Sequence, residues 1–240
     1  MRRYFFFITL LTAALAAAAL ASNWTVIASF DGPYATQGYG IEAYGNYLYC
    51  VEATGLSRIY VITTTGSLVN TIPLSSTFCY DLNFDGNYFW VAHTDHYCRR
   101  YTSAGSILGS FSIGSINGHG IAYDGTYIWL EGDTVPSEYI YRMSTTGSIY
   151  SSFSCPSGGD GALDYASSYL WFSNASTIYK TTTAGSVVDS FTAPAAEAYG
   201  ASWDGAYFWT TNRANGCVYK MQDVQDVAPA SFGRVKALYR

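Results

Sequence analysis

The chain of 240 residues carries 12 Lys and Arg against 17 Asp and Glu, a net charge of −5, and 18% of its residues are aromatic. So many aromatic and so few charged side chains exclude a disordered chain, and the scarcity of Lys and Arg argues against binding to nucleic acid. The 23 Tyr and 23 Gly favour an all-β fold over a helical bundle, because Tyr prefers strands and Gly prefers turns.

Residues 1–21 have the pattern of a signal peptide. Arg2 and Arg3 precede an uncharged, mostly apolar stretch that ends in Ala19-Leu20-Ala21, the small-x-small spacing that signal peptidase accepts. A retained membrane anchor is the alternative, although the stretch is at the short end for spanning a bilayer. Cleavage would leave 10 basic against 17 acidic residues, a net charge of −7. We therefore expect a secreted, periplasmic or cell-surface protein with no membrane span after cleavage.

A pattern of Gly-x-x-aromatic-Asp-Gly-x-Tyr-apolar-Trp defines five repeated units. It occurs at 120–129 and 200–209, and variants occur at 40–49, 81–90 and 161–171. The repeated Tyr recurs with a mean period of 40 residues, at Tyr47, Tyr88, Tyr127, Tyr169 and Tyr207. Each unit divides into four short segments between Gly, Asp, Ser or Thr turns. Four strands in about 40 residues are typical of a β-propeller blade.

The repeat predicts a five-bladed β-propeller over residues 22–222. The second segment of each unit is apolar on both faces, as expected for a strand between stacked blades. The fifth unit lacks a fourth segment, but residues 25–30 match the fourth segment of the second unit, 106–111, position for position. We therefore expect the N-terminal strand to complete the last blade and to close the ring by strand pairing.

Residues 223–240 break the repeat and form a predicted C-terminal tail. Its acidic start is followed by Arg234, Lys236 and Arg240. A solvated extension or a strand on the outside of the ring is one interpretation. A sorting or attachment signal is the other.

The five cysteines do not form an even disulfide framework. In the repeat alignment Cys50 and Cys98 replace core residues, so we expect both to behave as buried small hydrophobic side chains. Cys79 and Cys155 lie near connections between blades. One disulfide among the loop cysteines is therefore an open alternative in an oxidising compartment.

The one cluster of metal-ligand residue types is His93-Thr94-Asp95-His96, with Cys98 close behind. Zinc needs three or four converging ligands, and this spacing on a loop does not provide them. The Asp-Gly pairs at Asp85, Asp124 and Asp204 are typical of turns, since calcium loops need several acids in close alternation. We expect no metal and no cofactor.

One set of positions varies between the blades and lies where a propeller binds ligands. The residues just before the repeated Gly are Tyr39, Tyr80, His119, Asp160 and Tyr199. The loops after the second segments add Glu52, His93, Glu131, Asp133, Asn174 and Asn212. Aromatic faces beside hydrogen-bonding groups suit a carbohydrate or the end of a peptide. The alternative is that the tyrosines merely fill a narrow five-bladed channel.

Two resemblances extend this interpretation. The Tyr123–Trp129 segment followed by Ile140–Met143 resembles the blades of NHL-like secreted bacterial propellers. Thr36-Gln37-Gly38 and Glu52-Ala53-Thr54-Gly55 resemble the T-Q-G and E-S-T-G segments of plant-type glutaminyl cyclases, which are five-bladed propellers. That likeness implies that Glu52 is the acid/base of Gln cyclisation. Here Glu52 lies two residues further along its strand than the Glu of that family.

Four functions follow from these observations. We favour a secreted binding or interaction module that recognises a carbohydrate, a peptide or a cell-surface protein. The alternatives are an enzyme similar to glutaminyl cyclase, a glycosidase that uses two of Asp160, Glu52 and Glu131, and a purely structural surface protein.

Overall fold

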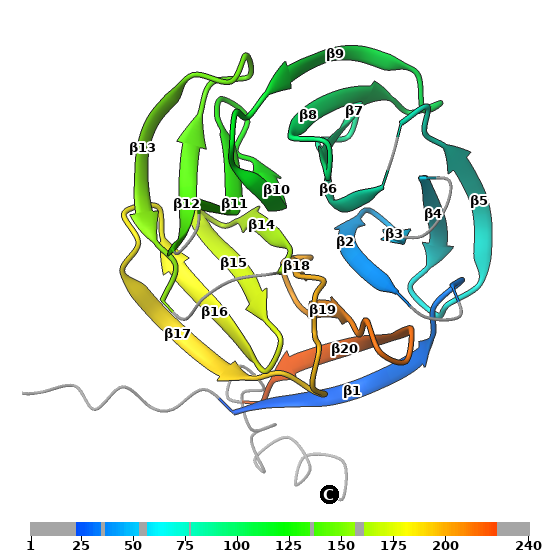
Figure 1. Cartoon of the computed structure of the whole chain (residues 1–240). Coiled ribbons are helices and arrows are strands. Elements are labelled where there is room, and N and C mark those ends of the chain that lie inside the picture. The colour runs from blue at the N-terminus through cyan, green and yellow to red at the C-terminus, as the bar shows by residue number, and fades with distance from the viewer. Residues whose placement is uncertain are drawn as a thin grey trace, which may run out of the picture.

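The computed structural model describes residues 23–34, 37–52, 57–76, 78–134, 137–156 and 161–224. These residues form five four-stranded antiparallel sheets arranged as blades around a central axis (Figure 1). Blade 1 contains β2 (Gly38–Tyr44), β3 (Tyr47–Glu52), β4 (Arg58–Thr63) and β5 (Leu68–Pro73). Blade 2 contains β6 (Cys79–Phe84), β7 (Tyr88–His93), β8 (Tyr97–Thr102) and β9 (Ile107–Ser112). Blade 3 contains β10 (Asn117–Tyr123), β11 (Ile128–Thr134), β12 (Ser137–Met143) and β13 (Ile149–Ser154).

The last two blades complete the ring. Blade 4 contains β14 (Leu163–Ala166), β15 (Tyr169–Asn174), β16 (Thr177–Thr182) and β17 (Val187–Thr192). Blade 5 contains β18 (Ser202–Trp203), β19 (Phe208–Thr211), β20 (Cys217–Asp223) and the N-terminal strand β1 (Trp24–Asp31). The predicted all-β five-bladed propeller is therefore confirmed.

The first and last parts of the described chain form one sheet. Strand β1 pairs antiparallel with β20, from Trp24 opposite Asp223 to Asp31 opposite Cys217. This confirms that residues 24–30 complete the last blade. Strand β20 ends at Asp223, so the first residue of the predicted tail belongs to the blade. The rest of that tail from position 225, and the predicted signal peptide, lie outside the described residues.

The blades stack through the second strand of each sheet. Leu48, Phe89 and Ile128 are fully buried on one face of these strands, and Trp90, Trp129, Trp171 and Trp209 are buried on the other. A strand enclosed on both faces needs apolar side chains at successive positions, which explains the apolar run in each repeat. The Asp of the Asp-Gly turn also accepts a hydrogen bond from this Trp, as in the 2.8 Å bond from Trp129 Nε1 to Asp124 Oδ2.

The turn before each outer strand needs glycine for two reasons. Gly147 has a φ of +94°, which side chains other than glycine rarely adopt. A Cβ at this position would also lie 2.8 Å from the ring of Phe111 in the preceding blade. The repeated Gly-Ser therefore marks the place where one blade contacts the next.

All five cysteines are free in the structure, so the disulfide that we considered is not present among them. Cys50, Cys79 and Cys98 are completely buried, as expected for Cys50 and Cys98. Within the described residues we find no helix that is long and apolar enough to cross a membrane.

Candidate functional site

A small pocket opens at the end of the central channel where the inner strands begin. Its volume is about 80 Å³, and it is lined by Tyr39, Tyr80, His119, Gly161, Ala162, Tyr199 and Arg213. We call these seven residues the channel-mouth pocket. Four of them are predicted ring residues, each placed just before the repeated glycine or its replacement. Asp160, the fifth predicted ring residue, lies outside the described residues.

The aromatic rings of the channel-mouth pocket touch one another in sequence. The ring centroid of Tyr39 lies 5.1 Å from that of Tyr199 and 5.4 Å from that of Tyr80. Tyr80 meets the imidazole of His119 edge to face at 5.2 Å. Tyr39 is 8% exposed, whereas Tyr80 and Tyr199 are half-buried. The pocket therefore has an aromatic wall that is packed and held in place but still accessible.

Both ring nitrogens of His119 lie near polar side chains. Asn117 Nδ2 lies 2.9 Å from His119 Nε2. His119 Nδ1 lies 3.9 Å from Glu131 Oε2. Glu131 is 1% exposed and lies behind the histidine rather than on the pocket wall. His119 therefore lines the pocket while the Glu131 carboxylate stays buried.

Arg213 places a positive charge on the rim. Its guanidinium carbon lies 4.6 Å from the ring centroid of Tyr199, and its Nε lies 3.0 Å from Glu197 Oε2. The backbone around it is strained, because Gln37 (φ +68°) and Glu197 (φ +63°) both occupy the left-handed region. The Gln37 amide donates to the Arg213 carbonyl at 2.9 Å, and the Arg213 amide donates to the Glu197 carbonyl at 3.0 Å. Strained backbone of this kind is concentrated at binding and catalytic sites.

Hydrogen bonds between blades hold the pocket backbone. The Tyr39 carbonyl accepts a hydrogen bond from Thr211 Oγ1 of blade 5, and the Tyr199 carbonyl accepts one from Ser173 Oγ of blade 4. The amide of Ala162 also donates to the Tyr199 carbonyl, at 2.7 Å. Tyr39 and Tyr199 are therefore each held by a hydrogen bond from a neighbouring blade.

Asp81 occupies the channel at the repeat position that the other four units fill with glycine. Its Oδ2 accepts hydrogen bonds of 2.9 Å from the amides of Ile121 in blade 3 and Leu163 in blade 4. A Cβ on Gly40 would lie 2.2 Å from Asp81 Oδ1, so the glycine leaves the space that the carboxylate uses. Asp81 lies one residue along strand β6 from Tyr80 of the pocket.

Two further buried carboxylates, Glu42 and Asp164, lie on inner strands. Asp164 Oδ2 accepts the amide of Trp203 at 2.7 Å, and Glu42 Oε2 accepts a hydrogen bond from Asn83 at 3.1 Å. Burial raises the pKa of Asp164 to about 6. Burial and the nearby charges of Asp164 and Asp81 raise the pKa of Glu42 well above its usual range. Burial likewise raises the pKa of Asp81.

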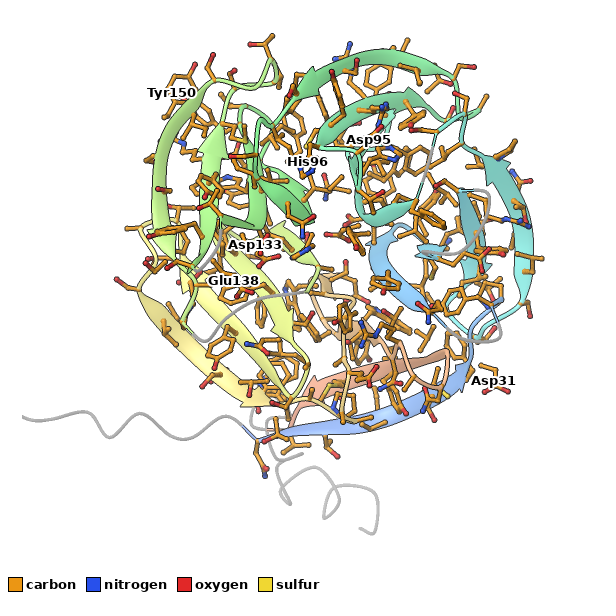
Figure 2. All side chains as sticks on the ribbon, viewed as in Figure 1. Asp31, Asp95, His96, Asp133, Glu138 and Tyr150 are labelled. Carbon is orange, nitrogen blue, oxygen red and sulfur yellow. The ribbon has the colours of Figure 1, made fainter. Side chains whose placement is uncertain are left out.

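The remaining predicted site residues do not line the channel-mouth pocket. His93 is buried, with Nε2 2.9 Å from the Tyr101 hydroxyl. Asn212 donates to the Ala196 carbonyl and accepts the Asn215 amide at 3.0 Å. Asn174 is the last residue of β15 and pairs with Thr177 of β16. Asp133 of β11 pairs with Glu138 of β12 (Figure 2).

Glu52, the residue that the cyclase resemblance singles out, makes two contacts away from the pocket wall. Its Oε1 accepts a 2.8 Å hydrogen bond from the Tyr60 hydroxyl and lies 3.4 Å from Arg58 Nε. Of the two segments that carry the resemblance, Thr36 and Ala53-Thr54-Gly55 lie outside the described residues.

The His93–His96 segment does not converge on a point. Asp95 binds Arg99 through both carboxylate oxygens, at 2.9 and 2.5 Å. His96 Nδ1 donates to the Ile116 carbonyl at 2.8 Å, and Figure 2 shows both side chains near the β7–β8 turn. Across the part of the chain that the structure describes, no group of three or more His, Cys, Asp or Glu could hold a metal ion.

Sequence reasoning missed Arg213, Gly161 and Ala162 as pocket residues. Arg213 follows Asn212 in the loop after β19, and Gly161 and Ala162 follow the ring position of blade 4. An alignment of the five repeats could have identified them, because Arg213 follows Asn212 and Gly161 follows Asp160, which are both predicted site residues.

No protein-family model and no curated protein sequence matches this chain. Among solved structures, it is similar to the glutaminyl cyclase of Myxococcus xanthus, with a TM-score of 0.66 and 12% identity over 83% of this chain and 95% of that one. It also matches BamB of Moraxella catarrhalis, with a TM-score of 0.45 and 12% identity over 80% of this chain and 61% of that one. At these identities the likeness shows the propeller fold alone.

Proposed function

We propose that this protein is a secreted β-propeller binding module that recognises a carbohydrate or a peptide at the channel-mouth pocket. The observation that carries the proposal is the pocket itself, where Tyr39, Tyr80 and Tyr199 meet His119 and Arg213. Aromatic faces stack against the apolar side of a sugar ring or a peptide side chain, and the imidazole and guanidinium fix its polar groups.

The chemistry of the pocket favours binding over catalysis. None of the described carboxylates lines it, so the two acids that a glycosidase needs are not among the described lining residues. The buried acids of the channel, Asp81 and Asp164, are engaged with backbone amides of other blades. They support the ring instead of facing a ligand.

A cyclase similar to the glutaminyl cyclases is the second candidate, and the resemblance around Glu52 is the observation that favours it. Glu52 is held by Tyr60 and Arg58, which is an arrangement for a structural ion pair. A purely structural surface protein is the third. Secretion itself rests on the sequence of residues 1–21.

Thermal unfolding of residues 22–240 against a panel of oligosaccharides and short peptides tests the proposal. A ligand at one hundred times its Kd stabilises the folded state by about 2.7 kcal/mol, which gives a measurable rise in Tm. We expect such a rise with at least one panel member, and a smaller rise with the same ligand in Tyr80→Ala. Tyr150→Ala is the matched control, since Tyr150 is 61% exposed on outer strand β13 (Figure 2). No rise with any panel member would leave the structural role.

A further inference from the structure

A second kind of site recurs between successive blades. The space between blades 2 and 3 has a volume of about 290 Å³ and is lined by Trp90, Arg100, Gly109, Ser110, Phe111, Thr145 and Thr146. The space between blades 3 and 4 has about 250 Å³ and is lined by Asp124, Trp129, Arg142, Ser151, Tyr165 and Thr183. We call them the 2/3 groove and the 3/4 groove.

The two grooves are built from equivalent positions. In blade 2, Trp90 pairs across the sheet with Arg100, which pairs with Gly109. In blade 3, Trp129 pairs with Arg142 in the same register, and Arg142 pairs with Ser151. The opposite wall comes from the turn before the outer strand of the next blade, through Thr145 and Thr146 in one groove and Thr183 in the other. The two grooves therefore share the Trp, the Arg, the residue opposite that Arg and one Thr, and they differ in their remaining lining residues.

Both grooves lie away from the channel-mouth pocket. Their walls include the turn that joins the third and fourth strands of the next blade. The 3/4 groove also includes Asp124, from the Asp-Gly turn between β10 and β11. In an antiparallel blade these turns lie at the end opposite the loops that carry the pocket residues. A ligand in a groove and a ligand in the pocket would therefore bind independently.

The cation in each groove is held by aromatic rings and forms no ion pair with a carboxylate among the described residues. The guanidinium carbon of Arg100 lies 5.0 Å from the ring centroid of Tyr88 and 5.4 Å from that of Trp90. That of Arg142 lies 3.7 Å from Tyr127 and 5.8 Å from Trp129. Such contacts fix the planar group and leave its N–H donors for another acceptor. Arg142 Nε is buried with no acceptor in the described structure.

The other lining groups suit hydroxylated ligands. Ser110, Thr145 and Thr146 in the 2/3 groove, and Ser151 and Thr183 in the 3/4 groove, supply hydroxyls that both donate and accept. The aromatic part comes from Trp90 and Phe111 in the 2/3 groove and from Trp129 and Tyr165 in the 3/4 groove, which also contains the carboxylate of Asp124. The volumes fall just below the roughly 300 Å³ lower bound of drug-sized pockets, which is enough for one small ring.

We propose that the 2/3 and 3/4 grooves are equivalent carbohydrate subsites, each taking one pyranose unit of an oligosaccharide through its arginine and hydroxyl side chains. Two related subsites on one ring bind a repeating glycan with avidity, because the second contact becomes intramolecular. A neutral hexose or a uronate would satisfy the same donors.

Calorimetric titration with maltohexaose, cellohexaose and hexagalacturonate tests the inference, with the corresponding monosaccharides alongside. We expect one hexasaccharide to bind at least tenfold more tightly than its monosaccharide, and the neutral and acidic sugars to show which unit the arginines prefer. Arg100→Gln with Arg142→Gln should reduce the affinity at least tenfold. Ser110→Ala with Ser151→Ala, exposed positions with little effect on folding, should reduce it at least threefold.

Arg99→Gln is the matched control, because Arg99 neighbours Arg100 on β8 but binds Asp95 outside the groove. Tyr80→Ala separates this inference from the proposed function, since it removes binding at the pocket alone. Failure of every sugar to bind, or equal losses in Arg99→Gln and Arg100→Gln, would overturn the groove assignment. Loss of all sugar binding in Tyr80→Ala would do so as well.

Discussion

Asp81 of blade 2 and Leu163 of blade 4 are joined across the central channel, with Asp81 Oδ2 2.9 Å from the Leu163 amide nitrogen. The same oxygen accepts the amide of Ile121 in blade 3. One carboxylate therefore links three of the five blades directly beneath the channel-mouth pocket. The ring is closed at its perimeter by β1 and β20 and tied at its centre by this side chain.

Asp81→Ala is expected to lower the free energy of unfolding by about 3 kcal/mol, because it leaves two buried backbone amides without an acceptor. Asp81→Asn retains an acceptor oxygen and removes a buried charge, so its cost should be below about 1 kcal/mol. Urea unfolding followed by tryptophan fluorescence measures both values. Equal losses in the two variants would show that the hydrogen bonds of Asp81 do not tie the blades together.

The protein is expected to become more stable when the pH falls from 7.5 to 5. The pKa of Asp164 is about 6 in the folded protein, against about 3.9 unfolded, and the pKa of Glu42 is also raised. The folded state thus binds protons more readily than the unfolded state. The stability that protonation of these acids contributes is complete below about pH 4 and is lost as the pH rises through 6. The difference between the folded and unfolded pKa of Asp164 corresponds to about 2 to 3 kcal/mol in the free energy of unfolding.

Asp164→Asn with Glu42→Gln should weaken this dependence between pH 4.5 and 7.5, as measured by Tm across the range, and leave the part that the raised pKa of Asp81 contributes. Asp95, whose pKa the Arg99 guanidinium holds below its usual value, loses its contribution only at lower pH. A wild-type Tm that falls steadily from pH 7.5 to 5 would contradict the assignment of raised pKa values to the channel acids.

At most two thiols should react in the native protein. Cys50, Cys79 and Cys98 are fully buried, and burial raises the pKa of each to about 12, so almost no thiolate forms at neutral pH. Cys155 and Cys217 are half-buried. Titration with Ellman's reagent should give no more than two thiols at pH 8 and five after denaturation without reductant. A value of three after denaturation would reveal a disulfide instead.

Glu52→Gln separates binding from cyclisation. Because Glu52 binds Tyr60 and Arg58 outside the pocket, we expect this variant to retain ligand-induced stabilisation. We also expect the wild-type protein to release no ammonia from a peptide that begins with Gln, as measured by a coupled enzymatic assay. Ammonia release that disappears in Glu52→Gln would favour the cyclase.

The repeat in the sequence is enough to predict the blades, because the Tyr and Trp that recur at a fixed period mark the second strand of each blade, which is enclosed between neighbouring sheets. It also predicted which positions lie together at the channel, because a ring places equivalent residues of all blades side by side. Tyr39, Tyr80, His119 and Tyr199 meet for that reason.

The contacts that depend on departures from the repeat were not predictable. Asp81 stands where the other units have glycine, and nothing in its own blade indicates that its carboxylate reaches Leu163, 82 positions away. Arg213 lies in a loop whose approach to Tyr199 depends on left-handed backbone at Gln37 and Glu197. The grooves arise from packing between blades, which the pattern within one blade does not contain.

Saturation-transfer difference NMR most directly tests whether the channel-mouth pocket is a binding site. The probes are a fixed panel of mannose, N-acetylglucosamine, galacturonate, cellobiose and trialanine. The starting protein carries Arg100→Gln and Arg142→Gln, which remove the groove arginines, and Tyr80→Ala and Tyr150→Ala are each added to it. We expect transfer to at least one probe in the starting protein and after Tyr150→Ala, with at least a fivefold loss after Tyr80→Ala. Transfer to no probe, or undiminished transfer after Tyr80→Ala, would show that the channel-mouth pocket is not a binding site.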